Sequence, residues 1–312
     1  MIALPRVWLA ADYNQAEVRV VAWKAPVPKL RQWFIEKKDV HNYVCRLIAR
    51  VVQENKIQTP INPSSGKPLF NSKSPEEYIK GDEERELSKR CVHAYNYGMG
   101  AEKFALITGI SVKLAEVLLT IYGALFPEIK RDYHGWCEKC LKKTKTIWMP
   151  DPVKFRKVFH GVNAYSPLDD NTLRSAYSCY PQCTIGAMLV RTLGKCCSIF
   201  ANDISDELRT QWEAWYGKDN WDAWYRLRGS GIRTPQAILW GGMDIRLNVH
   251  DSGVMSIPND PELMRWAATT WQRIAEVPIV ITPGNPEDDL VVPVDFKVGT
   301  TLASEDMKDY KL

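Results

Sequence analysis

The stretch that decides the fold runs from Trp8 to Trp23 and reads WLAADYNQAEVRVVAW, with Asp12 at its centre. The apolar run Val7–Ala11 before this aspartate predicts a short buried strand. A carboxylate therefore stands where a strand leaves the core. Such a position suits a metal ligand, because a rigid strand end holds the oxygen and leaves one face open. It also suits an aspartate that ends a strand or caps the next element.

A second aspartate far down the chain favours the metal-ligand interpretation. Residues 245–257 read IRLNVHDSGVMSI, two apolar strands around the turn 250–253 that contains Asp251. This pattern predicts a β-hairpin. Two carboxylates on adjacent strand ends can hold two divalent ions roughly 3.5 to 4 Å apart, the arrangement used for in-line displacement at phosphorus.

The third informative stretch is residues 81–100, GDEERELSKRCVHAYNYGMG, which predicts a helix with an acidic first turn. On it Arg85, Lys89, His93 and Tyr97 follow one another at intervals of four and share one face. Two cations followed by two aromatic rings suit a triphosphate with a base beyond it. An exposed basic face that ends in a packed tyrosine fits the same spacing.

The remaining pattern is mainly helical, with loops where Pro, Gly, Ser and Asn gather. Pro181 is expected to kink the longest predicted helix. We expect a linker around Pro26 and Pro28, helices at about 41–55, 102–108, 111–125, 171–199 and 261–276, a loop at 56–76, a hairpin around 149–152 and a strand within 291–299.

Composition sets the outer bounds. A chain of 312 residues suits one large or two modest domains, and its 41 Lys and Arg nearly balance 37 Asp and Glu. Residues 130–157 are an exception, with nine basic residues against three acidic ones, which fits either a polyanion-facing surface or a solvated helix face.

The eight cysteines have no regular spacing, and the CxxC of Cys137 and Cys140 has no second pair at zinc-site spacing. This inventory suggests reduced thiols and a cytoplasmic protein. The sequence shows no signal peptide and no apolar run of about 20 residues, so we expect no membrane partner.

Taken together, ADYNQAEVRV, the R-x-x-x-K-x-x-x-H-x-x-x-YG series and VHDS resemble the three polymerase motifs of family A (DNA polymerase I-like) DNA polymerases, in the right order. The sequence looks most like phage members, which would place the protein in a host cytoplasm. The resemblance implies an α+β right-hand fold, with an antiparallel palm sheet and helical fingers but without thumb and exonuclease domains. The implied divisions are 1–40 palm with the first catalytic strand, 41–170 fingers with the fingers helix at about 82–97, and 171–312 palm with the second catalytic hairpin at 245–257.

The resemblance also implies the chemistry. Asp12 and Asp251 would bind two Mg²⁺ ions, with Mn²⁺ as an alternative, to activate the primer 3′-hydroxyl and hold the triphosphate. Lys89 would also protonate the leaving pyrophosphate. For the incoming nucleotide, the resemblance implies triphosphate binding by Arg85 and Lys89, ribose exclusion by Glu17, and packing on the nascent base pair by Tyr97. For the DNA, it implies close approach of the template at Gly98, primer-end contacts by Gln15 and His250, and minor-groove contacts by Arg174 and Gln182.

Several positions depart from the family pattern. His93 replaces the usual Phe or Tyr and would pack the incoming sugar differently. Ser252 stands where Glu is common, and Ser178 where Asn is often found. The Trp-rich segment at about 203–235 is an insertion without an assigned counterpart.

The implied function is template-directed DNA synthesis from dNTPs on primer-template DNA. Because the first motif begins so close to Met1, we expect a split polymerase in which a second polypeptide carries the thumb and the exonuclease. Two alternatives are a fragment of a phage-type single-subunit RNA polymerase and a non-catalytic DNA-binding remnant. Glu17 argues against the first, because it would exclude the ribose 2′-hydroxyl, and the intact aspartate pair argues against the second.

Overall fold

The computed structural model describes residues 5–62, 65–163, 166–202, 244–249 and 251–312, so the Trp-rich segment and His250 lie outside the described residues. The chain forms two compact units, called here the sheet unit and the helical unit. The sheet unit comprises Met1–Ala16, Ile185–Ile279 and Val291–Leu312, and the helical unit comprises Glu17–Thr184 and Val280–Leu290. The compact units thus divide at residues 16–17 and 184–185, whereas the predicted palm and fingers divisions lie at residues 40–41 and 170–171.

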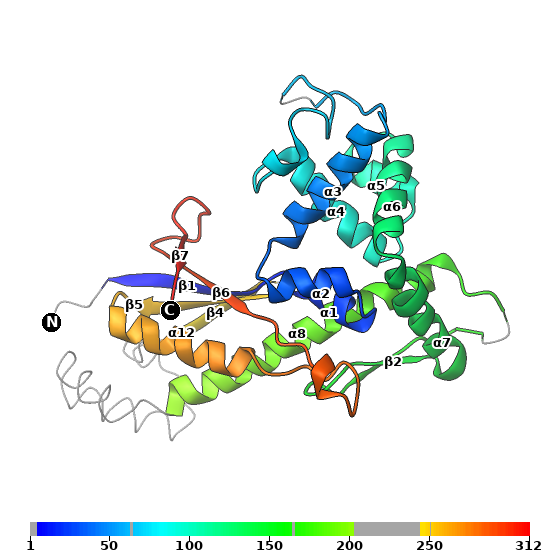
Figure 1. Ribbon diagram of the computed structural model, residues 1–312. Coiled ribbons are helices and arrows are strands. Elements are labelled where there is room, and N and C mark those ends of the chain that lie inside the picture. The colour runs from blue at the N-terminus through cyan, green and yellow to red at the C-terminus, as the bar shows by residue number, and fades with distance from the viewer. Residues whose placement is uncertain (1–4, 63–64, 164–165, 203–243, 250) are drawn as a thin grey trace, which may run out of the picture. The chain divides into compact units, whose positions relative to one another are not determined.

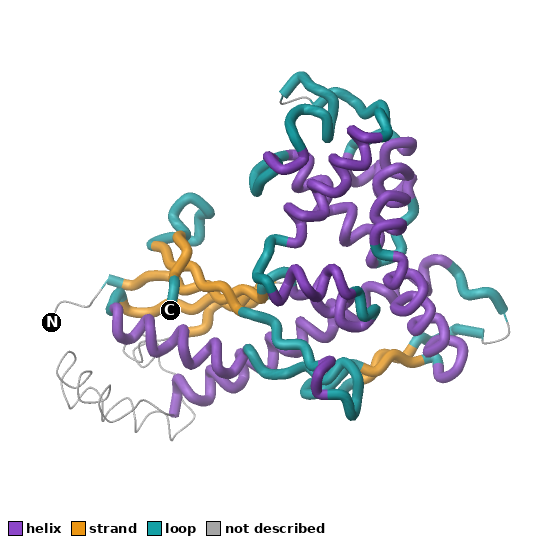
Figure 2. The backbone as a smooth tube through the Cα atoms, viewed as in Figure 1, coloured by secondary structure: helices purple, strands orange, loops and turns teal. Residues whose placement is uncertain are grey.

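The sheet unit is built on five antiparallel strands in the order β4-β5-β1-β6-β7 (Figures 1 and 2). In β1, Leu9, Ala11 and Tyr13 are buried while Asp12 is exposed, as expected for a strand with one covered face. The predicted opening strand, the hairpin at 245–257 and the strand within 291–299 are confirmed. The strands are β1 (Arg6–Tyr13), β4 (Asp244–Val249), β5 (Ser252–Pro258), β6 (Val294–Gly299) and β7 (Lys308–Tyr310).

Two helices cover the buried face of this sheet, α12 (Pro261–Ala275) and the C-terminal part of α8 (Asp170–Asn202). The Tyr13 hydroxyl lies 3.0 Å from the hydroxyl of Thr192 on α8. A Cβ at Gly253 of β5 would lie 2.5 Å from the Trp271 ring of α12, so only glycine allows this close packing. Both helices were predicted from their apolar periodicity.

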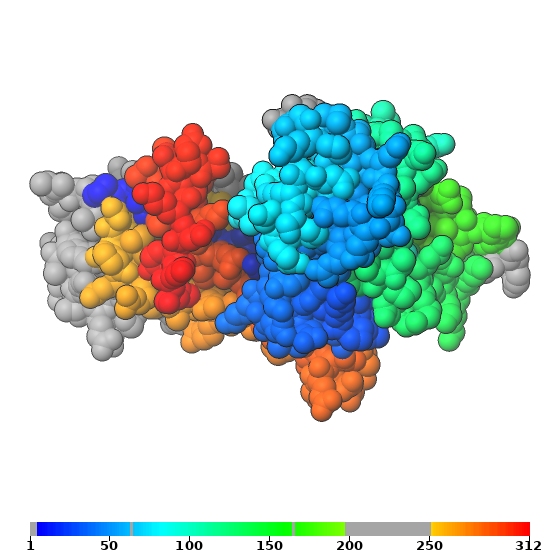
Figure 3. Space-filling model, turned by 45° about the horizontal axis from the view of Figure 1, so that its top comes forward, coloured from blue at the N-terminus to red at the C-terminus, as the bar shows by residue number. Residues whose placement is uncertain are grey.

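The C-terminal segment after β6 contains β7, a strand that was not predicted from the sequence. This short strand pairs with β6 through Val298 and Lys308, and so extends the sheet by one strand. The residues between β6 and β7 are mostly exposed, and the C-terminal segment forms part of the molecular surface (red in Figure 3).

The helical unit contains the fingers-like helix α4, which packs against α3, α5 and α6. The expected linker around Pro28 is in fact the start of α2, because proline fits the first helical turn, where its missing N–H is not needed. The elements are α1 (Ala16–Lys24), α2 (Pro28–Ile35), α3 (Val40–Glu54), α4 (Glu83–Asn96), α5 (Ala101–Thr108), α6 (Val112–Leu125), a π-helical turn (Ile129–His134), α7 (Gly135–Thr144), β2 (Thr146–Trp148) and β3 (Arg156–Val158).

Pro181 lies inside α8, which continues through it. A proline has no N–H to donate to the carbonyl four residues earlier, which belongs to Tyr177. The buried Tyr133 hydroxyl donates a hydrogen bond to this carbonyl instead. A side chain from the π-helical turn therefore supplies the hydrogen bond that the helix backbone cannot make.

Every cysteine whose side chain is described is a free thiol, in agreement with the reduced inventory expected from the sequence. Cys137 is buried and Cys140 is partly exposed. Across the described residues, no three or more His, Cys, Asp and Glu side chains gather into a metal-binding group, and this CxxC pair gains no further ligand.

No single described helix is both long enough and apolar enough to span a membrane; only α5 and α6 taken together, bent by 115°, satisfy length and composition.

Candidate active site

The sheet unit brings Asp12 and Asp251 together although they are far apart in sequence. Asp12 pairs in register with Ser252, the residue that follows Asp251. The Tyr13 N–H donates to the Asp251 carbonyl at 3.2 Å, which ties the end of β1 to the turn between β4 and β5. The carboxyl groups also lie close enough for the negative charge of Asp251 to raise the pKa of Asp12. Strand pairing thus produces the juxtaposition that the hairpin signature predicted.

Asp12 is held in an unusual electrostatic state. It lies on the open side of the sheet, yet crowding by the surrounding protein, together with the negative charges of Asp251 and Asp295, raises its pKa to about 7. Lys297 opposes this increase. Burial and like charges destabilise the ionised carboxylate, and a cation that binds beside it stabilises this charged form.

Asp295 is a third acidic residue at this position and was not identified from the sequence. It pairs with Asp12 across β1 and β6, and its carboxylate accepts a hydrogen bond from the Asn14 amide at 2.6 Å. The signal was present in the predicted strand VVPVDFKVG, where an aspartate interrupts alternating apolar residues. Only the strand order shows that this strand lies next to β1.

The chemistry of these donors fits Mg²⁺. Hard divalent ions prefer oxygen ligands, and Mg²⁺ is commonly held by one or two carboxylates together with substrate phosphates. Asp12 and Asp251 supply that number of carboxylates, and the raised pKa of Asp12 indicates an excess of negative charge there. The site therefore suits ions that arrive with a phosphorylated substrate.

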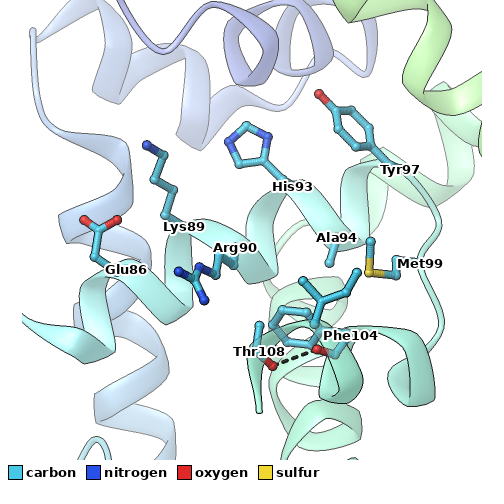
Figure 4. A pocket seen from close by; sticks show the side chains of 10 residues that line it. Glu86, Lys89, Arg90, His93, Ala94, Tyr97, Met99, Phe104 and Thr108 are labelled. Atoms are coloured by element: carbon cyan, nitrogen blue, oxygen red, sulfur yellow. Dashed lines mark hydrogen bonds between the residues drawn. The ribbon is translucent and has the colours of Figure 1, made fainter. Parts of the chain in front are cut away.

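In the helical unit, α4 presents a row of functional groups on one side. Lys89, His93 and Tyr97 project from the same side of the helix, whereas Arg90 projects from the opposite side (Figure 4). The rings of His93 and Tyr97 lie 5.9 Å apart between centroids. The structure thus places Lys89, His93 and Tyr97, three of the four residues of the expected stripe, on one side of α4.

Glu17, at the start of α1, is tied to this stripe. Its carboxylate accepts a hydrogen bond from the Tyr97 hydroxyl and lies 3.4 Å from His93 Nδ1. Two side chains of α4 therefore hold Glu17 in one position. A fixed carboxylate beside two rings is a suitable element for sensing the shape of a sugar.

Arg85 does not join the exposed stripe. It is only 6% exposed and forms an ion pair with Asp39 at 3.0 Å and another with Glu86. Its Nε also donates to the Asn42 side chain at 3.2 Å. Because Asp39 and Asn42 lie at the start of α3, Arg85 joins α3 to α4, and Lys89 is the cation that the stripe presents. The expected triphosphate role of Arg85 was based on spacing, which does not reveal these acidic partners.

His41 is a further residue at this site that sequence analysis did not single out. It is buried, and its ring centroid lies 5.9 Å from that of His93. Burial, then the charges of His93, Arg85 and Lys89, keep its pKa well below the usual value, so the imidazole is neutral. Among the described residues its Nδ1 has no hydrogen-bond partner. The sequence feature that could have identified His41 is its position two residues after Asp39, the N-cap of α3.

The other predicted site residues of the helical unit are Gly98, just after α4, and Arg174 and Gln182 on α8. Gly98 has a φ of +67°, a backbone conformation that favours glycine. A Cβ at this position would also lie 2.7 Å from the Tyr177 ring, so the close packing by itself is enough to require glycine. Arg174 and Gln182 lie on α8 at a spacing that shares one face, and Arg174 donates to Asn171.

In the sheet unit, Gln15 lies just after β1 with a φ of 48°, and its amide donates to Asn14 at 3.1 Å. It thus lies one residue from the asparagine that binds Asp295.

A cavity of about 280 Å³ lies between α4 and α5 (Figure 4). Lys89 and Arg90 contribute cations to its lining, and α5 contributes Phe104 and Ile107. Its wall thus combines positive charge with apolar surface. The complete lining is Glu86, Lys89, Arg90, His93, Ala94, Tyr97, Met99, Phe104, Ile107 and Thr108.

The architecture defines a class of fold: an α+β polymerase fold with an antiparallel palm sheet and helical fingers. The structure resembles the POL domain of Pol1 from M. smegmatis, solved in complex with DNA primer-template and dNTP, with a TM-score of 0.59 and 16% sequence identity. The match covers 94% of this chain and 39% of that chain. At this identity the likeness establishes the fold.

The similar sequences are DNA polymerase I proteins, although no protein-family model matches the chain. The chain is 26% identical over 203 residues to DNA polymerase I of Helicobacter pylori strain J99, covering 65% of this chain and 19% of the relative. It is 28% identical over 123 residues to DNA polymerase I of Deinococcus radiodurans, covering 39% and 10%, respectively. The matched region thus spans less than a fifth of these relatives.

Proposed function

We propose that the chain catalyses template-directed DNA synthesis, the transfer of a nucleotide from a dNTP to a primer 3′-hydroxyl. The observation that carries this proposal is the joining of Asp12 and Asp251 at neighbouring strand ends of a polymerase-type palm sheet. The similarity to DNA polymerase I supports the same chemistry. We assign the sheet unit to the palm and the helices around α4 to the fingers.

In this proposal Asp12 and Asp251 hold two Mg²⁺ ions. When bound, the ions supply a lowered pKa for the primer hydroxyl and charge neutralisation for the triphosphate. The aspartates orient these ions from rigid strand ends, and Asp295 adds negative charge that favours cation binding. Deprotonated Asp12 is the binding-competent form.

The stripe on α4 would receive the incoming nucleotide. Lys89 pairs with the triphosphate and can donate a proton to the leaving pyrophosphate. His93 and Tyr97 pack beside the sugar and the base, and Glu17 occupies the space that a 2′-hydroxyl would need. Arg85 stays a proposed triphosphate contact, and its ion pair with Asp39 joins α3 to α4.

Glu17→Ala is expected to raise ribonucleotide incorporation relative to deoxynucleotide incorporation by about tenfold or more, because steric discrimination by one side chain is typically worth 10- to 200-fold. The measurement compares single-nucleotide addition to a primer-template with dNTPs and with rNTPs. Glu17→Gln is the matched control and should remain selective, since it keeps the shape of the side chain.

The same assay separates DNA polymerase from RNA polymerase activity. The unmodified chain should prefer deoxynucleotides and lose extension when EDTA removes Mg²⁺. A strong preference for ribonucleotides in the unmodified protein would favour the RNA polymerase alternative.

We also propose that a second polypeptide, carrying a thumb and an exonuclease, completes the active polymerase. Affinity purification of the chain from its source lysate, followed by mass spectrometry, should recover such a polypeptide in stoichiometric amount, and adding it should increase primer extension. Full processive extension by the isolated chain would contradict this expectation.

A further inference from the structure

The hairpin formed by β2 and β3 has a basic surface with exposed aromatic rings. Residues 139–160 contain seven Lys and Arg but a single acidic residue, Asp151. Trp148 is 57% exposed and Phe155 is 38% exposed. Large rings are usually well buried in a folded chain, so two exposed rings within a cationic segment indicate an interaction surface.

Strand register places the tryptophan beside a cation. Trp148 pairs with Arg156 across the two strands, so both side chains lie on the same face. The Arg156 guanidinium carbon lies 5.6 Å from the centroid of the Trp148 ring. The neighbouring Ile147 and Met149 are buried and fix the hairpin to the helical unit.

The hairpin is also held by backbone hydrogen bonds. The Met149 N–H donates to the Phe155 carbonyl at 2.8 Å, and the Val280 N–H donates to the Asp151 carbonyl at 3.0 Å. These bonds anchor the turn as well as the strands of this small two-stranded sheet (Figure 2). The exposed rings therefore sit on a preorganised support, which lowers the ordering cost of binding.

The positive charge around these rings is largely uncompensated. Lys154 forms an ion pair with Asp151 at 2.8 Å, but the other exposed cations of the hairpin and of the preceding helix end have no ion-pair partner among the described residues. Such a field attracts polyanions. These cations are Lys142, Lys143, Lys145, Arg156 and Lys157.

We propose that the β2–β3 hairpin is a binding site for single-stranded DNA. Trp148 stacks on an unpaired base, and Arg156 and the surrounding lysines contact the phosphates. The exposed rings favour a single strand over a duplex, because base pairs inside a duplex do not present their faces to a protein side chain. The identity of this strand as the unpaired template rests on the proposed polymerase function, whereas binding of a free oligonucleotide does not.

Fluorescence anisotropy with a labelled oligothymidylate tests the site in the full-length chain. Trp148→Ala should weaken binding about tenfold, because stacking contributes about 1–3 kcal/mol per base and 1.4 kcal/mol is tenfold. Trp148→Phe should retain most of the affinity. Arg156→Ala/Lys157→Ala should lower the slope of log affinity against log salt by about 1.4, since each phosphate contact on a single strand contributes about 0.7.

The matched control is Lys56→Ala/Lys67→Ala, which removes two exposed lysines from a different loop of the same unit. An equal loss of affinity in this control, or wild-type binding by Trp148→Ala, would overturn the proposal. The proposal would also be overturned if the hairpin variants weakened binding equally for a blunt duplex and for a duplex with a 5′ template overhang. If the chain fails to extend primers even with the second polypeptide added, but binds oligothymidylate through Trp148, the proposed function fails and this site stands.

Discussion

Asp251→Ala is expected to lower primer extension by at least about 1000-fold, because a metal-binding carboxylate contributes several kcal/mol to the transition state and 1.36 kcal/mol is tenfold. DNA binding should stay close to that of the unmodified protein, since cationic side chains provide most of that affinity. The measurement pairs single-turnover extension with a salt titration of primer-template binding.

Asp309→Ala is the matched control for this variant. Asp309 is an exposed aspartate on β7 of the same sheet, and its removal should leave extension unchanged. Undiminished extension by Asp251→Ala would remove Asp251 from the proposed chemistry. Normal DNA binding without extension would support the carboxylate pair and exclude loss of folding as the cause. A chain that binds DNA but does not extend a primer even when the second polypeptide is added, and before any mutation, would be the non-catalytic remnant.

Asp12→Asn is expected to stabilise the metal-free protein above pH 7 while abolishing extension. Because the pKa of Asp12 is raised from its ordinary value of 3.8 to about 7, the folded state binds this proton more tightly than the unfolded chain does. The free energy of unfolding therefore falls as the pH rises from about 4 to about 7, and it levels off above that range. Asn carries no charge at any of these pH values, so the variant avoids this loss.

The expected gain is about 1–2 kcal/mol at pH 8, since each tenfold change in acidity corresponds to about 1.4 kcal/mol and water at the open face screens part of the full effect. Denaturant unfolding at pH 4 and pH 8, with a chelator present, measures it. At pH 4 the two proteins should be nearly equal in stability. Glu305→Gln, in the exposed loop after β6, should show no comparable gain at pH 8, and a destabilised Asp12→Asn at that pH would contradict the charge-crowding argument.

Much of the fold was predictable because its signals are local. The alternation around Leu9 and Ala11, the hairpin turn at Asp251 and the apolar periodicity of α12 each report on a few neighbouring residues. The start of α2 at Pro28 was missed because proline both ends and begins helices. The short strand β7 was missed because it gains its partner only when β6 is already in the sheet.

The candidate site likewise contains residues that local sequence patterns could predict and residues that they could not. Lys89, His93 and Tyr97 share a face because helical spacing fixes it, and Asp12 and Asp251 could be paired through their motifs. The position of Asp295 depends on strand order, which no local pattern encodes. Arg85 and His41 depend on how α3 packs against α4, so the sequence did not show that the arginine has acidic partners or that the histidine lies beside His93.

Because the Tyr133 hydroxyl donates to the Tyr177 carbonyl that Pro181 leaves without an N–H donor, positions 133 and 181 should not vary independently in evolution. A homologue with phenylalanine at position 133 would leave a buried carbonyl without a donor for as long as proline stays at position 181. A homologue that regains an ordinary residue at 181 no longer needs the tyrosine hydroxyl. Covariation of these two positions would therefore trace where the proline entered this lineage, independently of any change in the catalytic residues.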